Sequence, residues 1–290
     1  MKKFYLVLLL LVLLLFSGCS RLDQLTWDMT PEKWISTHSY YAVNIGDINF
    51  FFAEPSSTAI VYGLGIIIVL AGVYFLRNRG NSKSRLWWGV ALLLWGVSTF
   101  CAGTSYQAFS YEIKCAGRTV CLWTSWWEIW YLILFVISMN LITIAVAFSS
   151  SSGKILKGLI GYAVANCVIY LSVVLAGALI PHQFMASFEC MLLFASPTFL
   201  ILLTVNSIRY MKLRKQLDIL LVGAWVFMLL IVFAYFGFYI SGYADILWKN
   251  GIWFNANDVL HIGLIIWIFY LVFSVAKKIE DALKEEIYKK

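Results

Sequence analysis

Residues 57–76 read STAIVYGLGIIIVLAGVYFL, and residues 77–85, which follow directly, read RNRGNSKSR. The first segment has no charged residue and matches the roughly 20 apolar residues that a helix needs to cross a bilayer. Six more apolar runs of similar length follow, at 86–108, 127–149, 156–180, 184–208, 217–241 and 258–276. The pattern predicts an all-α polytopic membrane protein, with seven transmembrane helices over residues 57–276.

The composition supports a bilayer as the surroundings of this chain. Hydrophobic residues make up 62% of it and charged residues 13%, about half of the roughly 25% typical of soluble domains. The net charge of +7 does not indicate nucleic acid, because the Lys and Arg residues stand in the short segments between the apolar runs. The expected partner is the lipid bilayer, and nucleic acid is not expected.

The basic residues are distributed unevenly over these segments. The segments after the first, third, fifth and seventh runs hold Arg77, Arg79, Lys83, Arg85, Lys154, Lys157, Arg209, Lys212, Arg214, Lys215, Lys277, Lys278, Lys284, Lys289 and Lys290. The segments on the other side hold Arg21, Lys33, Lys114, Arg118 and Lys249. Because Lys and Arg concentrate in cytoplasmic loops, the N-terminal side is expected outside and the C-terminus inside. Acidic and basic residues at helical spacing predict a cytoplasmic helical tail over 277–290.

The first residues have the pattern of an export signal. Two lysines precede an apolar stretch over residues 4–16, and a Ser-Gly-Cys sequence ending at Cys19 follows. This order predicts a signal peptide over 1–18. The cysteine resembles that of a bacterial lipobox, which implies cleavage, lipidation of Cys19 and a bacterial inner (cytoplasmic) membrane; the alternative is an uncleaved first span. Residues 19–56 would be an extracytoplasmic segment, rich in aromatic residues, that covers the outer mouth of the bundle.

The cysteines divide by location. Cys115 and Cys121 share one predicted outer loop. An oxidising compartment would let them form a disulfide; a metal pair is the alternative, although the loop contains no His. Cys101, Cys167 and Cys190 lie in apolar runs and are expected to be small core residues.

Polar residues of several runs gather at the predicted outer ends. They are Ser98, Cys101, Thr104, Ser105, Tyr106, Gln107, Glu128, Glu189, Asn257, Asp258 and His261. Ionisable residues in membrane spans are costly and usually face the interior of the bundle. The spacing of Asn257, Asp258 and His261 lets them share one helix face. The sequence therefore predicts a polar pocket at the outer face of the bundle.

The ionisable residues of this group also have structural interpretations, and Glu189 fits a place in the headgroup layer. Asp258 fits the N-cap of the seventh helix, and Glu128 fits a first-turn carboxylate at the favourable end of a helix dipole. His261 needs a polar partner inside the membrane, through either a structural hydrogen bond or a catalytic or ligand role. The other two histidines, His38 and His182, are expected at the surface.

The layout resembles the CREST superfamily of seven-span membrane hydrolases, which includes alkaline ceramidases and adiponectin-type receptors. The segment 257–261, NDVLH, stands where that family has His-x-x-x-His, and 103–107, GTSYQ, stands where it has a Ser and a His. Glu128 corresponds to its acidic residue of the third span. The resemblance implies a zinc ion that activates water for cleavage of an amide or ester. Of the three histidines expected there, only His261 is present, so a three-His zinc site cannot form.

Two functions follow from these residues. One is a non-enzymatic seven-span module, a receptor, sensor or assembly partner, whose outer polar pocket holds a lipid or small-molecule ligand or a structural network. The alternative is a CREST-like metal-dependent hydrolase of lipid amides or esters. In that enzyme His261, Asp258 and Glu128 would bind zinc or activate water. Ser105 or Thr104 would help to hold the oxyanion.

Overall fold

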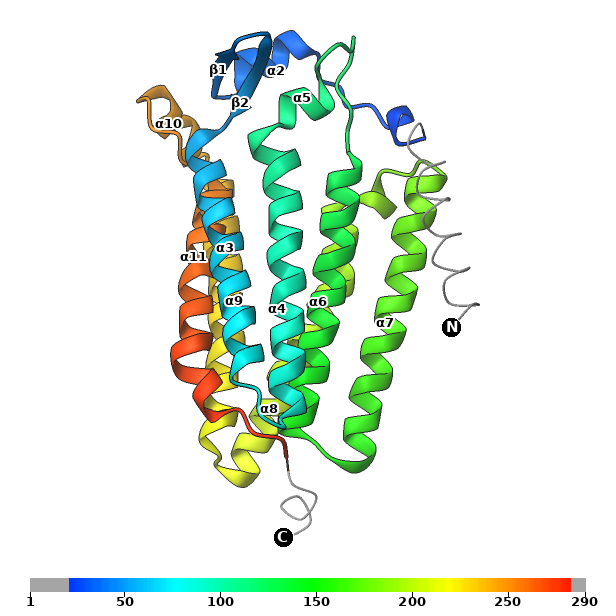
Figure 1. Cartoon of the computed structure of the whole chain (residues 1–290), viewed down its shortest axis with the longest axis vertical. Coiled ribbons are helices and arrows are strands. Elements are labelled where there is room, and N and C mark those ends of the chain that lie inside the picture. The colour runs from blue at the N-terminus through cyan, green and yellow to red at the C-terminus, as the bar shows by residue number, and fades with distance from the viewer. Residues whose placement is uncertain (1–20, 283–290) are drawn as a thin grey trace.

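The computed structural model describes residues 21–282, so the predicted signal peptide and Cys19 lie outside the described residues. Seven described helices are long and apolar enough to cross a membrane. They are α3 (Pro55–Arg77), α4 (Lys83–Ala102) with the π-helix η2 (Gly103–Ala108), α6 (Trp126–Ser150), α7 (Gly153–Leu179), α8 (Phe188–Leu213), α9 (Gln216–Ser241), and α11 (Ala256–Tyr270) with η4 (Leu271–Val275) and η5 (Ala276–Lys278). They run alongside one another (Figure 1), which confirms the predicted all-α polytopic bundle.

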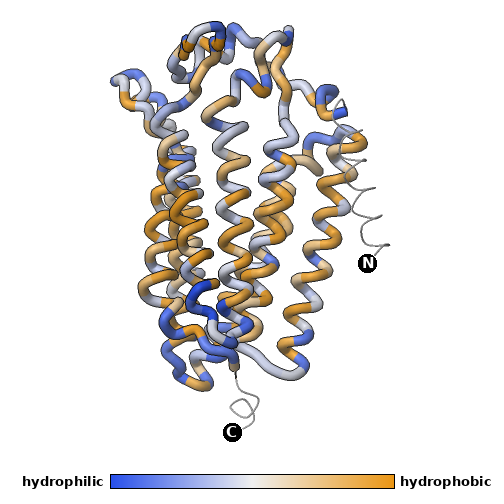
Figure 2. Tube along the Cα trace, in the orientation of Figure 1, coloured by the Kyte–Doolittle hydropathy of each residue, from blue (hydrophilic) through white to orange (hydrophobic). Residues whose placement is uncertain are grey.

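Six of these helices form a ring. α4 packs between α3 and α6, α8 joins α6 to α9, and α11 joins α9 back to α3. α7 lies outside the ring, against α6, at the edge of the bundle in Figure 1. Hydrophobic residues fill the middle of the bundle and hydrophilic residues gather toward both of its ends (Figure 2). The end where α3 and α8 finish, at Arg77 and Leu213, is called the basic end below.

The fifth span differs from the run predicted at 184–208. A short 3₁₀ turn, η3 (Phe184–Ala186), comes first, and α8 starts at Phe188 because the Ser187 side chain accepts a hydrogen bond from the backbone N–H of Cys190, at 3.0 Å. Such an N-cap sets a helix start more sharply than hydropathy does. The helix then continues to Leu213, so Arg209 lies within it and not in a loop.

Glycines allow α3 and α4 to approach closely. Gly65 and Gly72 on α3 face Gly96 and Gly89 on α4, with the same seven-residue spacing on each helix. A Cβ atom on Gly72 would lie 3.0 Å from the carbonyl oxygen of Gly89, and one on Gly96 would lie 3.1 Å from that of Gly65. Small residues at such an interface let helix backbones touch in a membrane.

The substitution Gly72→Ala should therefore lower the free energy of unfolding by ~1–3 kcal/mol, since the added methyl group forces the backbones apart. The matched control is Gly63→Ala on the same helix, where a Cβ would meet nothing within 4 Å. Equilibrium unfolding in mixed micelles measures both variants. Equal stability of the two would show that this close approach is not needed.

Short elements cover the opposite end of the bundle. They are η1 (Leu22–Gln24), α2 (Pro31–Thr37), β1 (Tyr40–Ile45), β2 (Ile48–Ala53) and α5 (Ser110–Lys114). Together with the loop up to Ser125 they are called the cap. Trp34 and Ala53 form a small core with Cys115 and Cys121, which are joined by the predicted disulfide. Cys101 and Cys190 are buried and reduced, and Cys167 is half-buried.

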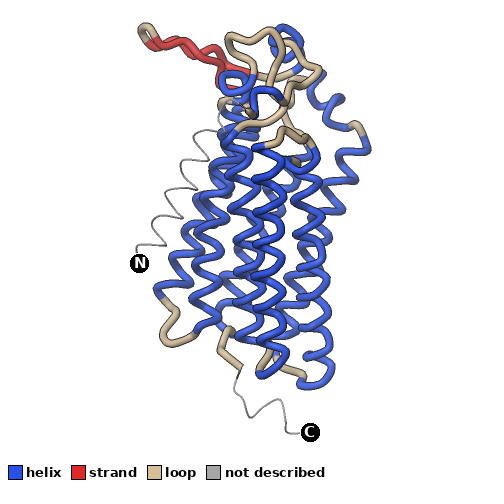
Figure 3. Tube along the Cα trace, turned by 90° about the vertical axis from the view of Figure 1, so that its right-hand side faces the viewer, coloured by secondary structure: helices blue, strands red, loops and turns tan. Residues whose placement is uncertain are grey.

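The β-hairpin in the cap is a departure from the all-α prediction. β1 and β2 pair antiparallel, with Tyr40 opposite Ala53 and Ile45 opposite Ile48. Figure 3 shows the hairpin projecting sideways from the bundle. The tight turn between the strands contains Gly46 at a φ of 59°, a conformation that glycine adopts without strain.

The helix predicted over 277–290 does not continue through the described part of that segment. Helical structure ends at Lys278, and residues 279–282 are not helical. The Asp281 carboxylate accepts hydrogen bonds from the backbone N–H groups of Lys83, at 2.8 Å, and Ser84, at 2.9 Å. Because a carboxylate is stabilised at a helix N-terminus, the chain leaves the helical path to cap α4. Residues 283–290 lie outside the described part.

Candidate functional site

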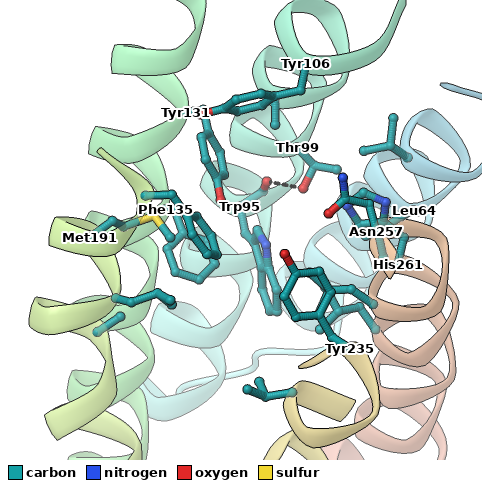
Figure 4. A pocket seen from close by; sticks show the side chains of 18 of the residues that line it. Leu64, Trp95, Thr99, Tyr106, Tyr131, Phe135, Met191, Tyr235, Asn257 and His261 are labelled. Carbon is teal, nitrogen blue, oxygen red and sulfur yellow. Dashed lines mark hydrogen bonds between the residues drawn. The ribbon is translucent and has the colours of Figure 1, made fainter. Parts of the chain in front are cut away.

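A cavity of about 290 Å³ lies inside the ring of six helices, and its lining residues come mainly from the halves of these helices nearer the cap. Figure 4 shows side chains that line it. Its apolar wall includes Leu64, Trp95, Phe135, Met191, Phe199, Met228 and Leu264. Its polar lining residues are Thr99, Tyr106, Gln107, Tyr131, Tyr235, Asn257 and His261. The predicted polar pocket is therefore mainly an aromatic and aliphatic cavity with a few polar groups, which is the usual character of a small-molecule site.

Two polar atoms on the lining residues have no protein partner. His261 Nδ1 and Gln107 Oε1 are buried and form no hydrogen bond within the described part of the chain. Thr99, by contrast, donates to the carbonyl oxygen of Trp95 at 2.9 Å. Since buried polar atoms in proteins are nearly always hydrogen-bonded, the free groups of His261 and Gln107 are available to a molecule in the cavity.

The start of α11 determines where His261 stands. The Asn255 side chain accepts hydrogen bonds from the backbone N–H groups of Asn257, at 2.8 Å, and Asp258, at 3.3 Å. The Asp258 carboxylate accepts one in return from the backbone N–H of Asn255, at 2.8 Å. This is a capping box, so the N-cap is Asn255 and not Asp258 as predicted. Asp258 is fully buried and holds the first turn, which places His261 one turn further into the cavity wall.

Glu54, which directly precedes α3, contacts this capping box. Its carboxylate lies 3.4 Å from the Asn255 amide nitrogen. Burial, followed by the negative charge of Asp258, raises the pKa of Glu54 from 4.5 to about 7, against the opposing hydrogen bond from Asn255. Sequence reasoning missed Glu54 because the contact joins residues 201 positions apart.

The raised pKa of Glu54 predicts a pH-dependent stability. A carboxyl group whose pKa is higher in the folded state binds its proton more tightly there, so its contribution to stability is greatest below about pH 4.5 and falls as the pH rises toward 7. The melting temperature should therefore be higher at pH 5.5 than at pH 8, and Glu54→Gln should reduce that difference. Asp47→Asn, at the exposed hairpin tip, is the control and should leave the profile of the wild type. An unchanged profile in Glu54→Gln would contradict this assignment.

Glu128 belongs to a separate polar cluster at the start of α6. Its carboxylate oxygen Oε1 lies 2.5 Å from Lys114 Nζ and accepts a hydrogen bond from Ser105 Oγ at 2.8 Å. Ser105 Oγ is also 2.7 Å from Ser125 Oγ. The structure thus brings together Glu128, Ser105 and Lys114, a residue for which the sequence predicts only a place in an outer loop. Glu128 is 2% exposed, and the ammonium group of Lys114 neutralises its charge inside the protein.

The three predicted metal ligands are not brought together. Within residues 21–282, no group of three or more His, Cys, Asp or Glu side chains could hold a metal ion. Glu128 is held by Lys114 and Ser105, Asp258 accepts a hydrogen bond in the capping box of α11, and His261 lines the cavity. The reason is that these side chains take different partners on different helices, although their Cα atoms lie near the same end of the bundle.

The remaining polar residues of the prediction have varied roles. Ser98 donates to the carbonyl oxygen of Tyr131 at 3.0 Å, a hydrogen bond that joins α4 to α6. His38 is not a free surface residue, because its ring stacks on Trp34 with centroids 4.5 Å apart. His182 is exposed, as expected.

No protein-family model, no curated protein and no solved structure matches this chain. The fold and the cavity define its class: a seven-helix membrane protein with an internal cavity near one end of the bundle. The likeness to the CREST superfamily stays a prediction from the motifs quoted above.

Proposed function

We propose that this protein is a membrane receptor or sensor that binds a small uncharged molecule in the central cavity. The observation that carries this proposal is the cavity between the helices, whose lining residues include two buried, unpartnered polar atoms, His261 Nδ1 and Gln107 Oε1. In this proposal the cap faces the outside and the basic end faces the cytoplasm, as the distribution of Lys and Arg predicts. The bacterial membrane is proposed on the lipobox-like leader alone.

The lining determines the chemistry of the ligand. None of the residues that line the cavity is Asp, Glu, Lys or Arg. A charged ligand would therefore be desolvated without a counter-ion, which is strongly unfavourable. Imidazole and amide groups bind hydroxyl, carbonyl or amide groups, so the expected ligand is a neutral, largely apolar molecule with one or two such groups. A cavity of about 290 Å³ accommodates a compact molecule of this kind and not a whole phospholipid.

The hydrolase alternative has less support. It needs Glu128, Asp258 and His261 around one water or metal ion, whereas Glu128 is neutralised by Lys114 and Asp258 is engaged in the capping box. Binding without chemical turnover uses the groups that remain free, His261 and Gln107.

The test is to identify a molecule that co-purifies with the protein. Native mass spectrometry of the detergent-solubilised wild type should show one neutral small molecule bound per chain. His261→Phe and Gln107→Leu should each weaken its binding roughly 5- to 30-fold, because each removes a hydrogen bond worth ~1–2 kcal/mol.

His182→Phe is the matched control, since it makes the same change at an exposed histidine and should retain the molecule. Equal occupancy in the wild type, His261→Phe and Gln107→Leu would contradict the proposed site. A purified wild type with an empty cavity that binds no neutral compound from a membrane extract would contradict the proposed function.

A further inference from the structure

A second cavity, of about 370 Å³, lies between the cap and the ends of the helices. Five aromatic side chains form much of its wall: Trp27, Trp34, Trp123, Tyr106 and Phe188. Tyr106 and Phe188 line the central cavity as well, so they stand at the boundary between the two. The second cavity differs from the first in that it also has charged residues in its wall.

The charges of this wall do not balance. Lys114 pairs with Glu128, which leaves that pair neutral. Glu189 also lines the cavity, and none of the salt bridges within residues 21–282 involves it. Burial lowers the pKa of His38, another residue of the wall, so its imidazole is neutral at pH 7. The wall therefore has one carboxylate outside these salt bridges, on the exposed residue Glu189 in the first turn of α8, beside several aromatic rings.

The cavity already holds one cation against an aromatic ring. The Lys114 ammonium lies 4.9 Å from the centroid of the Tyr106 ring, within the distance at which a cation is attracted to the face of an aromatic side chain. Trp27 is 40% exposed, so its indole is accessible to a molecule that enters. Indole is the side chain that binds cations most strongly in this way.

We propose that the cavity under the cap is a binding site for a small organic cation of the quaternary-ammonium class, with Glu189 as its counter-ion and the indoles around it. A quaternary ammonium group has no N–H donors and a diffuse charge, so aromatic faces and one carboxylate suit it better than a hydrogen-bonding site would. The site is distinct from the central cavity, which has no charged lining residue and is proposed to take a neutral ligand.

The experiment compares choline with 3,3-dimethylbutan-1-ol, its uncharged carbon analogue of nearly the same shape. The full chain is purified in a maltoside detergent, because phosphatidylcholine lipids would compete, and binding is followed by titration calorimetry. Choline should bind saturably and at least about tenfold more tightly than the neutral analogue. No saturable choline binding, or equal affinity for both compounds, would overturn the proposal.

Variants then locate the site. Glu189→Gln should weaken choline binding at least about tenfold and leave the neutral analogue unaffected. Trp27→Leu, at a partly exposed position, should also weaken choline binding while the protein stays folded. Glu32→Gln is the control, because it removes one negative charge from the exposed first turn of α2, outside the cavity wall. Choline binding that is unchanged in both Glu189→Gln and Trp27→Leu would overturn the assignment. His261 lines only the central cavity of the two, so His261→Phe should leave choline binding unchanged and distinguishes the two sites.

Discussion

Asp218→Ala should lower the free energy of unfolding by ~3–5 kcal/mol, because it leaves the guanidinium of Arg209 buried without its counter-ion. Arg209 Nε lies 3.2 Å from Asp218 Oδ2, and the two residues are 8% and 0% exposed. Arg209 also donates to the carbonyl oxygen of Ser149 at 2.6 Å, which ties α8 to the end of α6. The loss of Asp218 should therefore loosen the packing of the basic end as a whole.

Neighbouring hydrogen bonds strengthen this expectation. The Asn206 amide donates to Ser150 Oγ at 2.9 Å, and Trp225 Nε1 donates to Asn206 Oδ1 at 3.0 Å. These contacts join α6, α8 and α9 beside the ion pair. A charge left unpaired here has no easy route to water, since Asn206 is fully buried.

A double variant distinguishes the effect of the unpaired Arg209 charge on stability from the effect of lost side-chain packing. Arg209→Met combined with Asp218→Leu removes both charges and should recover most of the stability that Asp218→Ala loses. Asp245→Ala, at an exposed position of α10 (Tyr243–Lys249), is the control and should remain near the wild type. Unfolding in mixed micelles gives all four free energies. If Asp218→Ala were as stable as the control Asp245→Ala, the ion pair between Arg209 and Asp218 would be dispensable.

Lys114→Met should lower the free energy of unfolding by about 3 kcal/mol, since it leaves the carboxylate of Glu128 buried without its counter-ion. The damage should be local, with faster amide hydrogen exchange in α5 and η2. Adding Glu128→Gln to Lys114→Met removes the unpaired charge and should restore more than half of the loss.

This pair of variants also distinguishes two roles of Glu128. If the carboxylate of Glu128 is structural, the free energy of unfolding of the protein should depend on Lys114, as the geometry of the cluster indicates. A general base or metal ligand would instead leave Glu128→Gln alone fully stable, with a defect only in a catalysed reaction. Wild-type stability of Lys114→Met would contradict the structural role.

Parts of the structure were predictable because their signals are local. The turn Gly46-Asp47 lies between two short segments rich in β-forming residues. A short turn between two such segments is a hairpin signal, so β1 and β2 are predictable from residues 40–53. The capping box of Asn255 and Asp258 likewise follows from residue types three positions apart. By contrast, Arg209 was counted among the loop residues that set the orientation, and nothing near it in the sequence marks Asp218 as its buried partner.

Hydropathy predicts the class of protein and its seven spans, and the spacing of Cys115 and Cys121 in one outer loop favours the disulfide that joins them. These follow from hydropathy and spacing over short segments, since the thickness of a bilayer sets the length of each span. Only the tertiary structure decided which polar groups meet: Glu128 with Lys114, Arg209 with Asp218, and neither with His261. The physical reason is that these contacts depend on how each helix is rotated about its axis and which neighbours it packs against. A hydropathy pattern averages over all faces of a helix and does not carry that information.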